Sequence, residues 1–432
     1  MSSTYAIRGN LIFTKTPEKF TVLEHGYLIC EDRTILGAFP ELPDRYRGME
    51  VTDYGERLII PGLSDLHLHA PQYGFRGMGH YIPRDGWTTW FDLYAFPEES
   101  RYADLSYARK AYTRLADDLL TTTTTRFAMF ATLHRPATEL LMELLSERGF
   151  AGYVGKLNMD RNSLPGYQET TEETIRETIL WLNNCQGHFG DIKPIVTPRY
   201  TPTSTDASME ALGKIVEEYR VPVMSHLSEG LNEIEWVKEL KPGLSCYGEA
   251  YDMYGMFGSV TPTIMAHCVY PNEAELALMS RRNVTVAHCA QCNLSLGNIA
   301  PIRTYLEHGI RVGLGTDVAG GDTLELLRHL PFVTDASYAR WNLTERQDPM
   351  EEPKGLDLPA AFYLASKGGG SFFPQKAGSF EEGFCFDAVV LDDQRLSDEW
   401  HSYNPIERLE RLTRMGDDRE IHAKYINGKK VL

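Results

Sequence analysis

The sequence predicts an α/β fold, a (β/α)8 barrel of the TIM type with a small composite β-sandwich domain built from both ends of the chain. From about residue 60 to residue 370, short apolar runs alternate with longer amphipathic, charge-rich segments, which is typical of repeated βα units. Outside this region, both ends of the chain show the alternating pattern of short strands. We therefore expect residues 1–60 and 372–432 to share the small domain and residues 61–371 to form the barrel.

The barrel is predicted from the number of apolar runs. Eight runs, each followed by a helix-like segment, match a closed barrel better than an open, doubly wound sheet. The expected strands are 63–68, 125–133, 153–159, 192–197, 221–225, 263–266, 284–287 and 311–315. Helix starts lie between them: Thr170 and Glu173 have the spacing of a capping box, and Asn272 stands at the cap of a later helix.

The ends of the chain and two long connections complete the predicted organisation. The expected strands of the small domain are 5–13, 27–38, 384–392 and 422–432. The segment 70–100 is rich in glycine and aromatic residues, and the segment 341–356 is polar and contains proline. Both are longer than ordinary connections, so we expect them to act as lids or binding walls.

Composition and charge limit the possible partners. The 432 residues are 42% hydrophobic and 24% charged, which is ordinary globular usage. With 43 Lys and Arg against 60 Asp and Glu, the net charge of −17 disfavours nucleic acid and anionic membranes. The chain begins without a signal-peptide pattern, and no apolar run approaches the ~18 residues of a membrane span. Because its seven cysteines are scattered, we expect a reducing compartment and a cytoplasmic protein.

Histidines and an aspartate follow the predicted strands, at the face where a barrel of this kind builds its site. His67 and His69 have the period-two spacing that places both rings on one side of the first strand. The ends of the last four strands carry His226, His267, His288 and Asp317. A single histidine at a strand end is usually structural, but several in register indicate a metal site. Three imidazoles and a carboxylate suit zinc and leave a coordination position for water.

Glu229 lies three residues beyond His226. A loop glutamate is normally a solvated charge, but one that follows a metal ligand is placed to move protons between water, substrate and leaving group. Because zinc lowers the pKa of its water to about 7, hydroxide is available without a strong protein base. The sequence therefore predicts hydrolysis, with Glu229 as acid and base.

Four motifs resemble those of the amidohydrolase superfamily, in its mononuclear zinc branch of deaminases and chlorohydrolases. They occupy residues 61–69, 225–226, 265–267 and 315–317. Thr-Pro-Arg at 197–199 stands where a bridging lysine would follow strand four, which implies one metal instead of a bridged pair. Longer motifs are similar to those of the members that deaminate guanine, and they occupy residues 69–73, 154–160, 194–200, 226–229 and 317–321.

The resemblance implies roles for particular residues. His67, His69, His226 and Asp317 would hold one zinc ion (Zn²⁺) per subunit, and Fe²⁺ is the alternative metal. Glu229 would carry a proton from water to a ring nitrogen and then protonate the leaving amine. His267 and Asp317 would orient the water and the tetrahedral intermediate. The implied reaction is hydrolysis of guanine at C2 to xanthine and ammonia, by a homodimeric enzyme of purine metabolism.

Three residues are expected to bind the base. Arg199 supplies fixed donors for the O6 edge of guanine, and the amide of Gln72 can donate and accept. Tyr200 is expected to form a stacking or packing wall, with ordinary core packing as the alternative. A surface ion pair is the alternative for Arg199. Together, Arg199 and the metal predict a locally cationic pocket.

The segment 70–100 is expected to close over the base, and packing against the barrel or a partner subunit is the alternative. Its aromatic residues include Tyr73, Phe75, Trp87 and Trp90.

Other functions stay open on the residues alone. Another aminohydrolase of the same branch would act on a related purine, a pyrimidine or a triazine, and the metal ligands do not separate these. An inactive barrel could serve as an oligomeric scaffold, although such relatives tend to lose ligands that are all present here. The chain also departs from the family near the pocket: Cys268 replaces a glycine, Ala290 a proline and Cys292 a serine. The pair Cys289-x-x-Cys292 has no second CxxC, which disfavours a zinc or redox site of its own.

Overall fold

A parallel sheet with its strands in chain order lies at the centre of the molecule. The computed structural model describes residues 4–80, 87–398 and 400–432. The order β11-β12-β13-β14-β5-β6-β7-β9 makes consecutive strands neighbours and returns β14 beside β5. These eight strands are β5 (Leu63–His69), β6 (Thr124–Phe130), β7 (Ala151–Gly155), β9 (Ile192–Pro194), β11 (Val223–Leu227), β12 (Thr263–His267), β13 (Val284–His288) and β14 (Arg311–Leu314). Each overlaps an expected strand, so the predicted parallel arrangement is confirmed.

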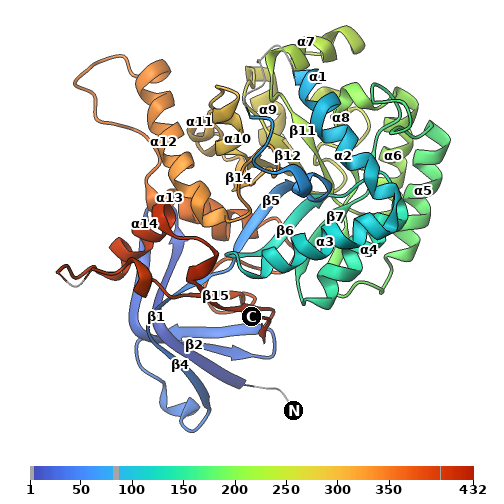
Figure 1. Cartoon of the computed structure of the whole chain (residues 1–432). Helices are drawn as coiled ribbons and strands as arrows, with labels where there is room; N and C mark the ends of the chain where they lie inside the picture. The colour runs from blue at the N-terminus through green and yellow to red at the C-terminus, as the bar shows by residue number, and fades with distance from the viewer. Residues whose placement is uncertain (1–3, 81–86, 399) are drawn as a thin grey trace.

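Helices surround this sheet (Figure 1). The longer ones are α3 (Leu105–Leu120), α4 (Arg135–Glu147), α5 (Thr171–Asn184), α6 (Asp206–Tyr219), α7 (Leu231–Leu240), α9 (Glu273–Arg281) and α12 (Leu330–Arg340). The shorter ones include α8 (Glu249–Asp252), α10 (Ala290–Ser295), α11 (Ile302–Glu307) and α13 (Leu358–Tyr363). The predicted capping box of Thr170 and Glu173 opens α5, and Asn272 caps α9, so both helix starts are confirmed. Among the described residues, no helix combines the length and apolarity that a bilayer crossing requires.

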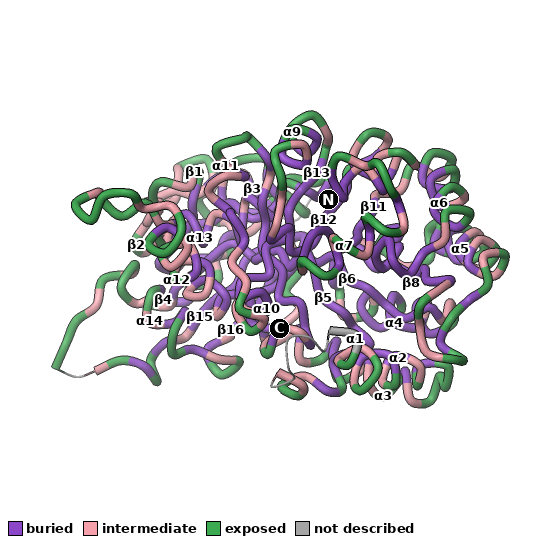
Figure 2. The backbone as a smooth tube through the Cα atoms, turned by 90° about the horizontal axis from the view of Figure 1, so that it is seen from above, coloured by how far each residue is buried: buried purple, intermediate pink, exposed green. Residues whose placement is uncertain are grey.

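Side chains from distant parts of the sheet meet in one buried cluster, which includes Leu66, Phe130, Tyr153, Met224, Ile264 and Ala287. A flat sheet would hold these strands apart, so the sheet curves around the cluster. The two ends of the sheet are also bonded to each other. The backbone N–H of Val196, just after β9, donates to Pro222 O at 2.9 Å, and the N–H of Met224 in β11 donates to Val196 O at 2.9 Å. The segment after β9 is therefore bonded to β11, the strand at the other end of the order. Figure 2 shows the buried chain gathered in the middle of the molecule.

The two ends of the chain share a second sheet, of order β17-β16-β15-β4-β1-β2-β3. Its strands are β1 (Thr4–Thr16), β2 (Lys19–Glu31), β3 (Thr34–Phe39), β4 (Glu50–Pro61), β15 (Ala388–Leu391), β16 (Ile421–Ile426) and β17 (Lys429–Lys430), and α14 (Pro405–Met415) precedes β16. Antiparallel pairing of β15 with β4 joins the carboxyl-terminal strands to the amino-terminal ones. The sheet folds back on itself, because the N–H of Ile35 in β3 donates to Phe384 O at 2.8 Å, just before β15. The register of the parallel pairing between β1 and β4 shifts between Arg8 and Asn10, and the two strands stay paired on both sides of the shift.

Three expectations about local structure are wrong. Residues 422–432, expected as one strand, contain most of β16 and all of β17, which pair antiparallel after a turn at Asn427, whose φ is 49°. Residues 27–38, expected as one strand, belong to two, because Asp32 has a φ of 54° and the chain turns there between β2 and β3. The expected loop 70–100 is largely helical: it contains η2 (Ala70–Phe75), α1 (Trp87–Trp90), η4 (Phe91–Ala95) and α2 (Phe96–Ser100). Residues 81–86 and the side chain of Trp87 lie outside the described part. The segment 341–356 follows α12 and extends away from the sheet (Figure 1).

A buried ion pair joins the two sheets. Arg126 of β6 donates through Nε to Oδ2 of Asp387 at 2.6 Å, and through Nη2 to Oδ1 of Asn427 at 2.7 Å. The side chains of Arg126 and Asp387 are 3% and 0% exposed. Since Asp387 directly precedes β15, the pair fixes the carboxyl-terminal strands to the parallel sheet.

We expect Arg126→Met to lower the free energy of unfolding by about 3–5 kcal/mol, because Asp387 would stay buried without its partner. Urea denaturation followed by circular dichroism measures the change. The exposed pair of Arg8 and Asp53, 2.7 Å apart, provides the control, since Arg8→Met should cost less than about 1 kcal/mol. Equal costs in the two variants would contradict the role of the buried pair.

Candidate active site

Four of the predicted ligands meet at the carboxyl ends of the parallel strands. Nε2 of His69, at the end of β5, lies 3.2 Å from Nε2 of His226 on β11. Oδ1 of Asp317, three residues after β14, lies 3.1 Å from Nε2 of His67 and 3.5 Å from Nε2 of His69. The three imidazoles and the carboxylate thus point their ligand atoms at one place.

These spacings fit a zinc ion. Ligand atoms about 2.0–2.1 Å from a tetrahedral zinc are about 3.3–3.4 Å from one another. Nδ1 of His226 donates to the carbonyl oxygen of Arg199 at 2.6 Å, which leaves a lone pair on Nε2, as metal-ligating histidines require. His67 is fully buried, and in the described part of the chain neither of its ring nitrogens meets the geometry of a hydrogen bond. A buried nitrogen of this kind calls for a ligand.

The ionisation of these groups also suits a cation. Burial lowers the pKa of His69 and of His226 well below the usual range, and the neighbouring imidazoles act in the same direction. Burial raises the pKa of Asp317, but the close contact with Nε2 of His67 and the charges of His267, His67 and His69 outweigh burial, so the pKa lies far below the usual range. Neutral imidazoles beside a carboxylate are the forms that bind metal.

Backbone conformation around the site is unusual. Ser228, His267, Cys268 and Asp317 have φ values of 49°, 68°, 49° and 51°, in the left-handed region that residues other than glycine rarely adopt. All four lie at or just after the carboxyl ends of β11, β12 and β14, beside the candidate site residues. Such conformations cluster at functional sites, where the surrounding structure holds them.

Asp65 braces the ligands, and the sequence reasoning missed it. Its Oδ1 accepts from the backbone N–H groups of His67, at 3.2 Å, and of Thr316, at 3.0 Å. Its Oδ2 accepts from the hydroxyl of Thr316 at 2.6 Å. Asp65 therefore ties the end of β5 to the residue before Asp317. The period-two pattern, which places Asp65 on the side of His67 and His69, could have identified it.

Glu229 and His267 lie beside the ligand cluster. Oε2 of Glu229 is 3.4 Å from Nε2 of His267, which is 3.8 Å from Oδ2 of Asp317. Since the amide oxygen of Asn293 accepts from Nδ1 of His267 at 3.0 Å, Nε2 carries a lone pair. Burial lowers the pKa of His267 to about 4, and burial together with Asp317 and Glu233 raises the pKa of Glu229 well above its usual range. A carboxyl group with a raised pKa beside a neutral imidazole can exchange protons near neutral pH.

Arg199 is buried against a partner that the sequence reasoning missed, Glu99 of α2. Its Nη1 donates to Oε2 and Oε1 of Glu99 at 2.8 and 3.1 Å, and its Nη2 donates to Oε1 at 3.1 Å. The charge of Arg199 is therefore balanced by Glu99, so of the two groups expected to make the pocket cationic, Arg199 and the metal, only the metal would add net positive charge. Periodicity could not reveal the pair, because 100 residues separate its members.

The other predicted substrate residues lie nearby. Gln72 donates through Nε2 to Oε1 of Glu99 at 2.7 Å, and its Oε1 accepts from the N–H of Ala319 at 3.3 Å. Tyr200 is 5% exposed, and its ring lies 6.3 Å from that of Phe91 and 6.4 Å from that of Trp236. Tyr200 thus belongs to an aromatic wall that also includes part of the segment 70–100.

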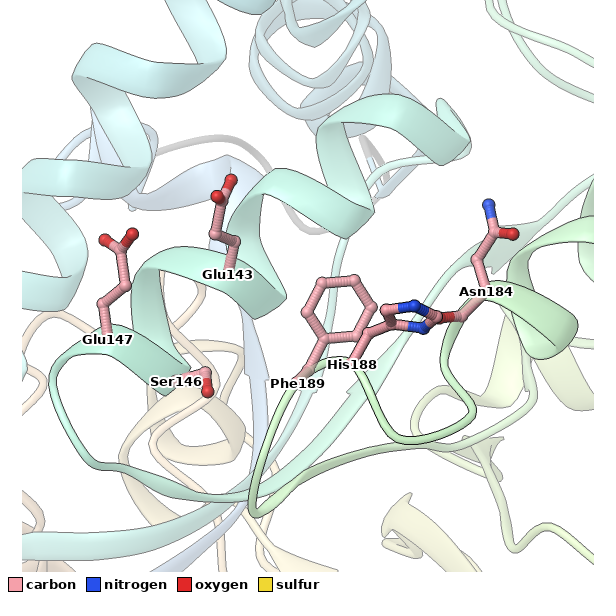
Figure 3. Close-up of a pocket in the computed structure, with 6 residues that line it drawn as sticks. All are labelled: Glu143, Ser146, Glu147, Asn184, His188 and Phe189. Atoms are coloured by element: carbon pink, nitrogen blue, oxygen red, sulfur yellow. The ribbon is translucent and has the colours of Figure 1, made fainter.

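Two cysteines lie close to the ligand cluster, whereas His288 and a surface hollow do not belong to it. The thiols of Cys289 and Cys292 are buried, and each lies within 4.8 Å of ligand atoms of the cluster, Cys289 beside Asp317 and Cys292 beside Glu229. His288 ends β13 but is not in these ligand groups of the described residues. A surface hollow of about 470 Å³ lies at the carboxyl ends of α4 and α5, and none of the candidate site residues lines it (Figure 3).

Comparison with known proteins agrees with this geometry. The sequence matches the amidohydrolase family over residues 58–431. Guanine deaminase of Dictyostelium discoideum is 35% identical over 389 residues, which cover 88% of this chain and 84% of that protein. Guanine deaminase of Escherichia coli K12 is 31% identical over 452 aligned positions, which cover 99% of this chain and 97% of that protein.

A solved structure is similar over its whole length. Guanine deaminase from C. acetobutylicum, with guanine bound in its active site, has a TM-score of 0.94 and 41% identity, covering 99% of this chain and 100% of that one. Given these matches, the chain belongs to the amidohydrolase family, in its guanine deaminase group.

Proposed function

We propose that this protein hydrolyses guanine at C2 to xanthine and ammonia, with one zinc ion per subunit. The observation that carries the proposal is the meeting of three imidazoles and Asp317 beside the carboxyl group of Glu229. The N–H groups that Arg199 and Gln72 do not use on Glu99, which include the buried Nε of Arg199, support a base as substrate. Relatives that are named guanine deaminase, one of them solved with guanine in its active site, support the choice of guanine.

The residues that would hold the metal are His67, His69, His226 and Asp317. Their nitrogen and oxygen donors suit zinc, and Fe²⁺ is compatible with the same set. When bound, zinc supplies Lewis acidity, which lowers the pKa of water to about 7. Elemental analysis of protein purified without added metal identifies the native ion.

Glu229 moves the protons of the reaction. It accepts a proton from the attacking water and passes it to a ring nitrogen of guanine. Glu229 then takes the second proton of the water, from the new hydroxyl group on C2, and delivers it to the exocyclic amine, so the C2–N bond breaks and that group leaves as ammonia. The oxygen of the water stays on C2, so guanine and water give xanthine and ammonia. Burial together with Asp317 and Glu233 raises the pKa of Glu229 well above its usual range, which makes this carboxylate a better proton acceptor than an ordinary glutamate.

His267 orients the water. Its Nε2 lone pair, fixed by the bond from Nδ1 to Asn293, can accept a hydrogen bond from a water that contacts both the imidazole and Glu229. Asp317 contributes Oδ2 on the same side, 3.8 Å from Nε2 of His267. These two side chains hold the water in line for attack on the flat base.

Parts of the wider assignment belong to the same proposal. We infer that the parallel sheet closes into a (β/α)8 barrel, which the hydrogen bonds of Val196 to the start of β11 support. The domain limits 1–60, 61–371 and 372–432, the homodimer and the cytoplasmic location stay predictions. Light scattering on the purified protein tests the dimer.

Ammonia release from a panel of bases tests the proposed reaction. The panel contains guanine, 8-oxoguanine, isoguanine, adenine and cytosine, and we expect guanine to have the highest kcat/KM. A zinc-loaded protein that releases no ammonia from guanine would overturn the proposal. Preferred turnover of another base would assign the chain to a different aminohydrolase activity.

We expect removal of the metal to abolish turnover and to destabilise the fold. Dialysis against a chelator should reduce ammonia release to background, because Glu229 alone cannot make water a good nucleophile. Bound metal stabilises the native state by about 4 kcal/mol when its free concentration is about 1,000 times Kd, so Tm should fall on its removal. One equivalent of zinc should restore both quantities; activity that survives full metal removal would contradict the ligand assignment.

A further inference from the structure

Glu99 lies at the centre of a buried polar cluster that no part of the proposed reaction uses. Its side chain is 1% exposed. It accepts from the guanidinium of Arg199, from Nε2 of Gln72 at 2.7 Å and from the hydroxyl of Tyr167 at 2.7 Å. The rings of Phe91 and Phe96 lie 4.9 and 5.1 Å from the guanidinium carbon of Arg199. The helix α2, which carries Glu99, is thereby fixed to the two residues expected to bind the base.

A carboxylate accepts hydrogen bonds and cannot donate them, so each neighbour of Glu99 must present a donor. For Gln72 this fixes the amide: Nε2 faces Glu99, and Oε1 faces the N–H of Ala319, 3.3 Å away. Ala319 is two residues beyond Asp317, so the amide is held between α2 and the ligand loop. Oε1 of Gln72 is therefore turned toward Ala319, and the bond to Glu99 sets which end of the amide points in which direction.

The groups that this arrangement leaves free are donors. Nε of Arg199 is buried and has no hydrogen-bond partner in the described part of the chain. Gln72 keeps its second N–H. Both residues adjoin the ligand cluster, since the carbonyl of Arg199 accepts from His226 and Gln72 follows His69 by three positions. A ligand that satisfies this side of the pocket must offer acceptors there.

We propose that Glu99 is a positioning residue that holds Arg199 and Gln72 as a donor-only array and thereby selects a purine with acceptors at O6 and N7. This inference rests on the proposed function. Guanine carries acceptors at both positions, whereas a 6-amino group places a donor where the array also donates. Two facing donors leave a buried polar group unpaired, which lowers affinity strongly.

The test compares guanine with 2,6-diaminopurine, which keeps the reacting 2-amino group and differs at C6. In Glu99→Gln, the side chain loses its charge and gains an N–H donor, so it no longer forces Arg199 and Gln72 to present donors to it, and the amide of Gln72 is no longer held in one orientation. We expect kcat/KM for guanine to fall roughly ten- to hundredfold and kcat/KM for 2,6-diaminopurine to fall much less. The ratio of the two values should therefore drop at least about tenfold.

Glu169→Gln is the matched control. Glu169 is also a buried carboxylate in an ion pair, 2.8 Å from Nζ of Lys156, but the bonds of its side chain go to Lys156 and Thr174. A general loss of structure lowers both substrates together and leaves the ratio unchanged, so the control should keep the wild-type ratio. A wild-type ratio in folded, zinc-loaded Glu99→Gln would overturn the inference.

Measurements on the wild-type enzyme distinguish failure of the proposed function from failure of the role of Glu99. Wild-type protein that does not deaminate guanine refutes the proposed function, whatever Glu99 does. If Glu99→Gln does not fold, competitive inhibition of the wild type decides: hypoxanthine, with O6 and N7 acceptors, should bind at least about tenfold more tightly than adenine. Equal inhibition constants would overturn the donor-only array.

Discussion

Replacing Glu229 by Gln should lower kcat for guanine by about 10²–10⁴-fold while the metal content stays at the wild-type level. The amide matches the carboxyl in size but cannot accept the proton of the attacking water. Retention of the metal is expected because the ligand atoms belong to other side chains: Oε2 of Glu229 lies 3.4 Å from His267, outside the group formed by His67, His69 and His226. Steady-state ammonia release and elemental analysis on one preparation measure both quantities.

Glu275→Gln is the control for this substitution. Glu275 is a buried carboxyl near the site; it accepts from the hydroxyl of Ser228 and from the N–H of Gly248, both at 2.9 Å, and burial raises its pKa to about 7. Loss of this carboxyl should leave kcat close to the wild-type value, because Glu275 does not reach the ligand cluster. Wild-type turnover by Glu229→Gln would remove Glu229 from the mechanism.

Strand positions and strand-end residues could be predicted because both depend on short-range patterns. Apolar runs of strand length marked the parallel strands, and a parallel sheet brings their carboxyl ends to one edge. That rule alone placed His67, His226 and Asp317 together, with no knowledge of side-chain packing. Glu229 followed from its distance of three residues from His226.

Features that depend on contacts distant in sequence could not be predicted in this way. The pairing of Glu99 with Arg199 requires the segment after β5 to fold into α2 and reach across the pocket. The periodicity of the sequence does not show that α2 lies beside Arg199. A glutamate in a predicted loop is normally interpreted as a solvated charge. The buried carboxylate beside Arg199 was missed for this reason. The turn at Asp32 was missed because it interrupts an alternating pattern for only two residues between β2 and β3.

Asp317→Ala should be more damaging than Glu229→Gln and should differ from it in metal content. Oδ1 of Asp317 lies 3.1 Å from Nε2 of His67, on the ligand side, and Oδ2 lies 3.8 Å from Nε2 of His267, on the side of the water. The substitution therefore removes a charged ligand and a group that orients the nucleophile. Metal stabilisation of a transition state is worth several kcal/mol, so kcat should fall at least about 10³-fold, with zinc below one equivalent.

Excess zinc separates the two losses in Asp317→Ala. High zinc should refill the three remaining imidazoles, His67, His69 and His226, by mass action, but turnover should stay low because the group beside His267 is still missing. Asp322→Ala, at an exposed aspartate of the same loop, is the control and should keep both zinc and activity. Full zinc occupancy and wild-type kcat in Asp317→Ala would contradict the ligand role of Asp317, whereas full recovery of kcat at high zinc would restrict Asp317 to metal binding and leave the orientation of water to His267.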